Sequence, residues 1–420
     1  GKWHLGQQAQ FLPLSHGFSD WYGIPYSHDM GCSYWQGGPT GCGIPWSDVP
    51  LPLMSGYDIL EQPVDLSTLS QRYITHATTF LQSPGDAPFL LYMAFQHQHI
   101  PQFCAVETCD STIRGVFGDG IKQMDDEVGA VLEALDASPS RSANTLVMFL
   151  SDNGPWIGQK LDGGSAGPFR GGKFDTYEGG IRSPAIARWT GIIAPGTVTP
   201  VVASSMDVFA TMVTLAGGVL PADRAIDGVD LTPWLLVQQP AQGVDQSSLG
   251  APHRCLMIYN GMPDTDSEGN SRPGIWAVRC GPYKAHFYTR ASCVPTEFTG
   301  KCESRSSTLQ SPPLMYQVEQ DPSENWPVDN RTSEYRTALE EILVARDTHL
   351  ATVVEVLGQM TLGDDIYLAP CCDNFATPLT GYPNCTCNPE NFDPFGSVSP
   401  YWPRAIGDGE SVRGNMRRLG

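Results

Sequence analysis

The amino-acid sequence predicts an α/β fold that is followed by a smaller antiparallel region. Two apolar runs of strand length, residues 88–95 and 144–154, each lead directly into polar residues, and an amphipathic helix is predicted between them. Helices that alternate with strands are typical of α/β proteins. After about residue 240 the pattern changes to short strands separated by turns, which indicates an antiparallel sheet.

The first half of the chain supplies the predicted α/β elements. Residues 1–70 are rich in loops, and residues 71–82 predict a short helix. The run "PFLLYMAF" (88–95) predicts a buried parallel strand, and "NTLVMFLSDNG" (144–154) predicts a second one. A helix that begins at residue 204 or 205 is expected to end at Gly217 and Gly218.

The helix predicted between the two strands covers residues 119–138. Its apolar residues recur at helical spacing, so one face is expected to be buried. The residues predicted on that face are Ile121, Met124, Val128, Val131, Leu132 and Leu135.

The second half predicts four short strands, at 255–260, 274–281, 283–289 and 313–318. A long amphipathic helix over 333–358 is expected to pack on the resulting sheet. We therefore divide the 420 residues into an α/β domain over 1–240 and an antiparallel domain over 250–420, which ends in a Cys-rich tail.

The charge of the chain limits its partners. The formal net charge is -20 and the isoelectric point is about 4.7. A basic surface for nucleic acid is therefore not expected. An anionic substrate would need local lysine, histidine or arginine side chains, or a metal. The sequence contains no apolar run of roughly 18 residues, so no membrane span is predicted.

The twelve cysteines favour disulfides over a zinc site, because no pair of C-x-x-C units is present. The close pairs are Cys32 with Cys42, Cys104 with Cys109, and Cys293 with Cys302, and the tail adds Cys371, Cys372, Cys385 and Cys387. Two N-x-[ST] sequons, at Asn330 and Asn384, predict glycosylation. Together these features predict a lumenal or extracellular protein.

The two predicted strand ends carry candidate site residues. His97 and His99 follow the first strand and could share one face, although they could also be exposed loop histidines. Asp152 and Asn153 follow the second strand, and their oxygens suit a hard cation such as Ca²⁺ or Mg²⁺. The alternative for this pair is a plain Asn-Gly turn capped by aspartate.

A glycine-rich segment over 163–184 follows the second strand. Its glycines would allow close approach to a ligand, and Lys173 would supply a positive charge for an anion. Residues 167–173 fit G-x-x-x-x-G-K, but Phe174 stands where a P-loop needs serine or threonine. We therefore reject a P-loop here.

Five motifs, "GKWHLG", "YSHD", "HQHIPQF", "SDNGP" and "GGKFDTYEGGIRSPA", occur in the order found in the sulfatase family. Nearly the whole chain resembles the arylsulfatase A and galactosamine-6-sulfatase group of that family. The resemblance implies an alkaline-phosphatase-like mixed sheet flanked by helices, here truncated at its N-terminal side, with a smaller C-terminal antiparallel α+β domain. It also implies a hydrolase that acts on sulfate esters.

The resemblance assigns roles to individual residues. Lys2 and His4 are implied to lie beside the nucleophile, and Ser27, His99 and Lys173 are implied to contact the sulfate or the leaving oxygen. Asp152 and Asn153 are implied to be two of the four ligands of Ca²⁺, or of Mg²⁺ in some members. The implied partners are a sulfated small molecule, lipid or saccharide, and a homo-oligomer is compatible with the resemblance.

The family nucleophile is a formylglycine made from the cysteine of a C-x-P-x-R motif. That motif lies upstream of Lys-Trp-His in the family, so the formylglycine and two metal carboxylates are expected in roughly a hundred preceding residues. Cys280-Gly-Pro-Tyr-Lys284 reads C-x-P-x-K, but it falls in the predicted C-terminal sheet. We interpret it as a chance match, with Cys280 paired, for example with Cys255, or simply buried.

The sequence leaves three functions open. The first is a sulfatase, of which this chain alone is expected to be inactive. The second is a secreted, non-catalytic relative that keeps the anion pocket for binding. The third is a phosphatase of the same superfamily, which the Lys-x-His pair and the single Asp-Asn pair disfavour.

Overall fold

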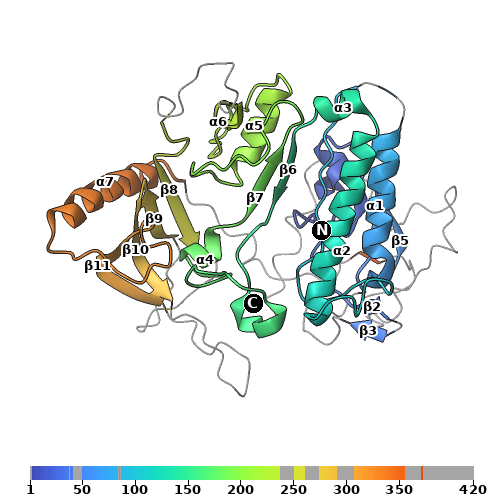
Figure 1. The fold of residues 1–420 in the computed structure, drawn as a ribbon, viewed down its shortest axis with the longest axis horizontal. Coiled ribbons are helices and arrows are strands. Elements are labelled where there is room, and N and C mark those ends of the chain that lie inside the picture. The colour runs from blue at the N-terminus through green and yellow to red at the C-terminus, as the bar shows by residue number, and fades with distance from the viewer. Residues whose placement is uncertain are drawn as a thin grey trace, which may run out of the picture. The chain divides into compact units, whose positions relative to one another are not determined.

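The computed structural model describes residues 2–36, 38–40, 50–83, 85, 87–236, 250–260, 274–290, 307–354 and 370–371 (Figure 1). The chain divides into two compact units, one of Gly1–Ser138 with Leu357–Gly420 and one of Pro139–Val356. None of the helices among these residues is long and apolar enough to cross a membrane. The domain boundary near residue 240 stays a prediction.

The first unit holds two helices and short antiparallel strands. Its helices are α1 (Leu66–Gln82) and α2 (Gly115–Asp136), and two short 3-10 helices cover Ala9–Phe11 and Pro13–His16. Strands β1 (Tyr22–Gly23), β4 (Leu53–Ser55) and β5 (Asp58–Glu61) form one sheet in the order β1-β4-β5, and β2 (Ser33–Trp35) pairs with β3 (Gly38–Thr40).

The helix predicted over 71–82 is confirmed and begins earlier, at Leu66. Asp65 is its N-cap, and its carboxylate accepts a hydrogen bond from the Ser67 amide at 2.9 Å. Leu66 and Leu69 then pack in a core with Ile24, Leu51, Leu53 and Phe103. The capping residue and the apolar spacing together explain where this helix lies.

The second helix is confirmed, but its predicted buried face is only partly correct, because only Leu135 of the six predicted residues is fully buried. The buried residues of α2 are Asp119, Gly120, Gln123, Glu127, Ala134 and Leu135, whereas Ile121 is 41% exposed. The polar side chains on the buried face have local partners: Asp119 accepts amide hydrogen bonds from Asp110 and Thr112, and Gln123 accepts one from Ala105. These polar side chains therefore lie on the buried face of α2 because they accept hydrogen bonds from backbone amides.

The predicted buried parallel strand over 88–95 is also wrong. The segment is irregular, and Leu90 and Tyr92 are 55% and 65% exposed. A strand requires hydrogen bonds to a neighbouring strand, and the described part of the chain pairs none with this segment.

The second unit begins with α3 (Pro139–Ala143), β6 (Val147–Leu150) and the 3-10 helix η3 (Ile157–Asp162). It continues with α4 (Glu178–Ile181), β7 (Ala185–Arg188), α5 (Asp207–Leu215) and α6 (Thr232–Leu236). The strand predicted within 144–154 is confirmed as β6, but it pairs antiparallel with β7 and is only partly buried. The helix predicted from residue 204 or 205 is confirmed as α5.

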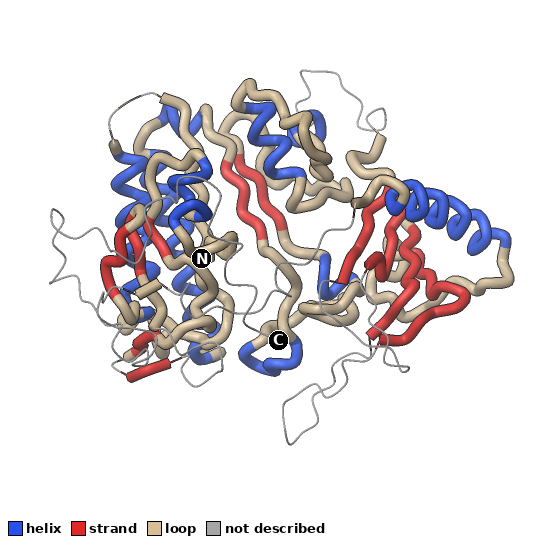
Figure 2. The backbone as a smooth tube through the Cα atoms, turned by 180° about the vertical axis from the view of Figure 1, so that it is seen from behind, coloured by secondary structure: helices blue, strands red, loops and turns tan. Residues whose placement is uncertain are grey.

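The predicted C-terminal antiparallel sheet is confirmed (Figure 2). Its strands are β8 (Cys255–Asn260), β9 (Gly274–Cys280), β10 (Tyr283–Arg290) and β11 (Ser307–Gln317), in the order β11-β10-β9-β8. Helix α7 (Ser333–Leu350) packs on this sheet through Tyr335, Ala338 and Ile342. Residues 351–354 are not helical, and residues 355–358 of the predicted helix lie outside the described residues.

The disulfide prediction is confirmed where the cysteines are described. Cys104 bonds to Cys109, Cys255 bonds to Cys280, and Cys32 and Cys371 are also disulfide-bonded. The other half-cystines predicted in close pairs or in the tail lie outside the described residues: Cys42, Cys293, Cys302, Cys372, Cys385 and Cys387.

Candidate active site

Lys2 and His4 lie beside the segment that leads into Ser27. Lys2 forms a parallel bridge with Ile24, and the His4 amide donates to the Pro25 carbonyl at 2.9 Å. This short ladder holds the "KWH" motif against the "YSHD" motif, although 20 or more residues separate them in sequence. The two motifs therefore lie together within the first unit.

His28 and His99 form the centre of this group. Their rings lie edge to face with centroids 5.6 Å apart. The Nε2 of His28 lies 3.0 Å from the Pro101 carbonyl, which can only accept, so Nε2 carries the proton. The Nδ1 of His99 likewise donates to the Ile100 carbonyl at 2.8 Å and lies 3.9 Å from the Asp29 carboxylate. A neutral His99 in this tautomer has Nε2 as its acceptor.

Burial keeps the neighbouring histidines neutral. Burial lowers the pKa of His28 to about 4, although its bond to Pro101 opposes that shift, and His99 and Lys2 lower it further. Partial burial and the charge of Lys2 lower the pKa of His4. Burial next to His28 lowers the pKa of His97 to about 3. At neutral pH, therefore, these three imidazoles carry no charge of their own beside the lysine.

Ser27 is a buried hydroxyl without a partner. The residue is only 5% exposed, and its Oγ has no hydrogen-bond partner among the described residues. Asp29 Oδ1 is likewise buried without a hydrogen bond. A buried polar atom without a partner costs free energy and is uncommon in native structures, so it points to a ligand or another group that would complete the bond.

Asp152 and Asn153 follow β6 in the second unit. The turn is held on both sides, because the Ser151 amide donates to Pro184 at 3.2 Å and the Gly154 amide donates to Gly180 at 3.0 Å. The Asp152 side chain is exposed, and it makes no hydrogen bond or ion pair within the described part of the chain. Carboxylate and amide oxygens, which these two residues can supply, suit a hard cation such as Ca²⁺.

Lys173 lies in the glycine-rich segment of the same unit. Its amide donates to the Pro155 carbonyl at 2.8 Å, and its Nζ lies 5.5 Å from the Trp156 ring centroid and 5.3 Å from that of Phe174. Aromatic faces at this distance stabilise the ammonium. Phe174 thus has a contact role where a P-loop would need a hydroxyl.

The glycines around Lys173 serve backbone packing. A Cβ on Gly154 would lie 1.8 Å from the Gly179 carbonyl oxygen, and one on Gly172 would lie 2.4 Å from that of Pro155. A Cβ on Gly179 would likewise meet the Arg170 and Gly171 carbonyl oxygens at 2.4 Å. The sequence predicts that the glycines of residues 163–184 admit a ligand, but at Gly172 and Gly179 the close approach is between two stretches of backbone.

The structure places Lys2, His4, Ser27 and His99 in the first unit and Asp152, Asn153 and Lys173 in the second. Sequence reasoning missed His28 and Asp29 as members of the first group. Both belong to the "YSHD" motif that we had singled out, so the signal was present. What the sequence could not show is that these side chains contact His99.

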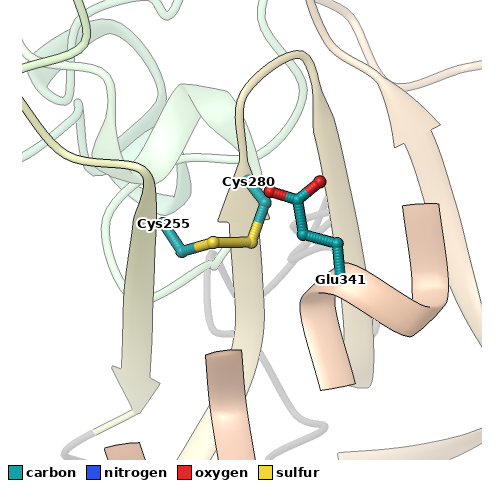
Figure 3. A group of neighbouring side chains, drawn as sticks. All are labelled: Cys255, Cys280 and Glu341. Atoms are coloured by element: carbon teal, nitrogen blue, oxygen red, sulfur yellow. A yellow bond between two sulfur atoms is a disulfide. The ribbon is translucent and has the colours of Figure 1, made fainter. Parts of the chain in front are cut away.

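Cys280 does not belong to a nucleophile motif. It is bonded to Cys255 across β8 and β9, which confirms the suggested pairing, and Figure 3 shows the Glu341 carboxylate of α7 beside that bond. These three side chains have the spacing of a metal site, but disulfide sulfurs are not thiolates and are poor ligands. Glu341 instead pairs with Arg254 at 3.0 Å.

The sequon residue Asn330 is exposed, just before α7, and Thr332 of the same sequon is the N-cap of that helix. Glycosylation of Asn330 stays a prediction, and Asn384 lies outside the described residues.

Comparison with known proteins supports the resemblance. A family model described as sulfatase matches residues 1–219, and one described as the C-terminal region of aryl-sulfatase matches residues 251–387. The chain is 37% identical over 400 residues to arylsulfatase A of Homo sapiens. The aligned region covers 92% of this chain and 75% of that protein. The chain is 32% identical over 408 residues to N-acetylgalactosamine-6-sulfatase of Rattus norvegicus, covering 90% of this chain and 71% of that protein.

The fold agrees with these matches. The crystal structure of the PsFucS1 sulfatase from Pseudoalteromonas sp. superposes with a TM-score of 0.67 at 24% identity, over 84% of this chain and 69% of that one. The α/β class with a C-terminal antiparallel sheet is therefore the fold of this protein. The two family matches and the identities over nine-tenths of its length show that the chain belongs to the sulfatase family.

Proposed function

We propose that this protein hydrolyses sulfate esters, with an aryl sulfate, a sulfolipid or a sulfated sugar as substrate. The observation that carries the proposal is the grouping of Lys2 and His99 near His28, which directly follows the unpartnered Ser27. A sulfate ester is a dispersed anion with several acceptor oxygens, so a lysine and hydroxyl or imidazole donors suit it. The matches to sulfatases support the same reaction.

Each site residue has a role in this reaction. Lys2 and His4 lie beside the nucleophile, where the Lys2 ammonium stabilises negative charge and the neutral His4 accepts a proton. Ser27 donates to a sulfate oxygen. His99, whose Nδ1 proton is held by Ile100, exchanges a proton through Nε2. Lys173 binds the sulfate or stabilises the charge that develops on the leaving oxygen.

Two groups outside the described side chains complete the chemistry. Asp152 and Asn153 would hold a Ca²⁺ ion, or Mg²⁺, which supplies positive charge to the sulfate oxygens. A formylglycine, which the sulfatase resemblance implies, would supply the nucleophile. The 420-residue sequence contains no C-x-P-x-R motif. The described disulfides support an oxidising compartment, so we propose a lysosomal or secreted location.

The test is hydrolysis by the full natural protein of a chromogenic aryl sulfate and of the matching aryl phosphate. We expect the sulfate to be cleaved faster, and we expect Lys173→Ala to lower kcat/KM by roughly 10²–10³-fold. Lys122→Ala is the matched control, because Lys122 is an exposed lysine of α2 that pairs with Asp126. Faster cleavage of the phosphate would favour the phosphatase alternative, and binding of sulfate without turnover would favour the non-catalytic one.

A further inference from the structure

A group of charged side chains is completely buried in the second unit. Lys284 and His286 of β10 are 0% exposed, as is Glu324, and Glu178 at the start of α4 is 1% exposed. Buried charges are rare in proteins unless they are paired. We call these four residues the buried ionic network.

Every member of the buried ionic network contacts another member. The Nζ of Lys284 lies 3.1 Å from Glu178 Oε1 and 3.2 Å from Glu324 Oε1. His286 Nε2 lies 2.8 Å from Glu324 Oε1. Arg279, which is mostly buried on β9, adds a second positive charge 3.5 Å from Glu178. Arg182, whose side chain is about half exposed, lies 3.7 Å from the same Glu178 carboxylate, so the two carboxylates are paired with one lysine and two arginines.

The protonation state of the network follows from these contacts. Burial raises the pKa of Glu324, but the hydrogen bond from His286 and the charge of Lys284 outweigh it, so the net pKa is lowered and the group is ionised. Burial lowers the pKa of His286, which is therefore neutral. An ionised carboxylate only accepts, so His286 donates from Nε2 and accepts at Nδ1 from the Thr176 hydroxyl at 3.1 Å.

Glu324 also has an uncommon backbone conformation. Its φ is +52°, in the left-handed region that non-glycine residues rarely adopt. Its second carboxylate oxygen accepts a hydrogen bond from the Glu178 amide at 2.6 Å, and its carbonyl accepts one from Arg170 at 3.1 Å. A glycine would suit this backbone but would supply none of the carboxylate contacts.

The network contacts the segment that carries Lys173. Thr176 and Glu178 lie three and five residues after Lys173, and the segment between has no regular secondary structure. The Gly179 amide bonds to Arg170 at 2.8 Å, and the Gly180 carbonyl accepts from Gly154 at 3.0 Å, directly after Asn153. Figures 1 and 2 show α4 beside the C-terminal sheet.

We propose that Lys284 and the buried ionic network position Lys173 for its role at the sulfate ester. The network links β10 to Thr176 and Glu178, and their backbone is linked in turn to the loop that carries Lys173. Lys284 and its partners are positioning residues, because none of them is proposed to touch the substrate. This inference rests on the proposed function of Lys173.

The test compares Lys284→Met, and the milder Thr176→Val, with Arg254→Met in the full natural protein. Arg254 is the matched control, because it directly precedes β8 of the same sheet and pairs with Glu341 of α7, but its side chain is 83% exposed. The first readout is amide hydrogen exchange. We expect residues 172–181 to exchange at least tenfold faster in Lys284→Met, with α7 unchanged, and a smaller increase in Thr176→Val. Wild-type exchange of this segment in both variants would overturn the proposal.

The second readout is the ratio of kcat/KM for an alkyl sulfate to that for an activated aryl sulfate. A poor leaving group depends on Lys173 more than a good one does, so displacement of Lys173 should lower this ratio by roughly tenfold or more. A smaller folded fraction would reduce both rates equally and leave the ratio unchanged. An unchanged ratio in an active variant therefore overturns the proposal.

The two readouts separate the two proposals. A wild-type protein that cleaves neither ester would refute the proposed function, and exchange of 172–181 would still decide whether the network holds the segment. If Lys284→Met does not fold, Thr176→Val decides both readouts, since it removes one hydroxyl at nearly constant volume.

Discussion

Two groups of buried polar side chains, one in each unit, differ in their hydrogen bonds. In the first unit, Ser27 Oγ and Asp29 Oδ1 are buried without hydrogen bonds among the described residues. In the second unit, Lys284, His286 and Glu324 are buried with partners at 2.8–3.2 Å. Orphaned polar atoms are expected where a ligand completes the contacts, whereas satisfied ones are expected in a scaffold. The comparison therefore marks Ser27 and Asp29 as a candidate ligand-binding group, and the buried ionic network as a candidate supporting group.

The largest effect on stability is expected when a buried carboxylate loses the cation that pairs with it. Lys284→Met would leave Glu178 and Glu324 buried with too little positive charge, so we expect the free energy of unfolding to fall by about 3–5 kcal/mol. Arg254→Met removes an exposed ion pair and should cost at most about 1 kcal/mol. Urea unfolding of the two variants measures the difference. Equal losses would mean that the buried ionic network is no different from a surface pair.

A pH effect of intermediate size is expected from the neutral histidines. The pKa values of His28 and His97 are lowered to about 4 and about 3 by burial, below the ordinary value of 6.5. As pH falls below 6.5, the unfolded chain binds these protons before the folded chain does, so folding stability falls. The loss for His28 alone should reach up to about 3 kcal/mol by pH 4.

Thermal unfolding from pH 7 to pH 4 tests this expectation in the wild type and in His28→Gln. The glutamine can still donate to the Pro101 carbonyl but does not titrate, so its melting temperature should fall less with acid. Parallel curves for the two proteins would contradict a neutral, buried His28.

The smallest and most specific effect compares two hydroxyl deletions. Ser27→Ala removes an unpartnered group, so stability should stay the same or rise by about 1 kcal/mol, while the KM for a sulfate ester rises. Thr176→Val removes a hydroxyl that is bonded to His286, so stability should fall by about 1 kcal/mol. Denaturant unfolding measures both signs. A loss of stability in Ser27→Ala would show that its hydroxyl has a structural partner.

The sequence by itself determined the family, the four longest of the described helices and the C-terminal sheet. These depend on information that lies close together in the chain: the five motifs, the N-cap at Asp65, the short alternating strands and the Cys104–Cys109 spacing. The roles of Lys2, Ser27, Asp152 and Lys173 came from the resemblance and stay proposals. Local patterns predict local structure because helices, turns and short loops are stabilised by neighbouring residues.

Only the tertiary structure decided the features that depend on distant partners. It showed that residues 88–95 do not form a strand, because pairing is set by a neighbour and not by apolar composition. It placed Gln123 and Glu127 on the buried face of α2. It also brought Lys284 to Glu178, 106 residues earlier in the chain. The physical reason is common to these cases. Strand pairing and the pairing of a buried polar side chain both need a partner from elsewhere in the fold, and no local pattern records that partner.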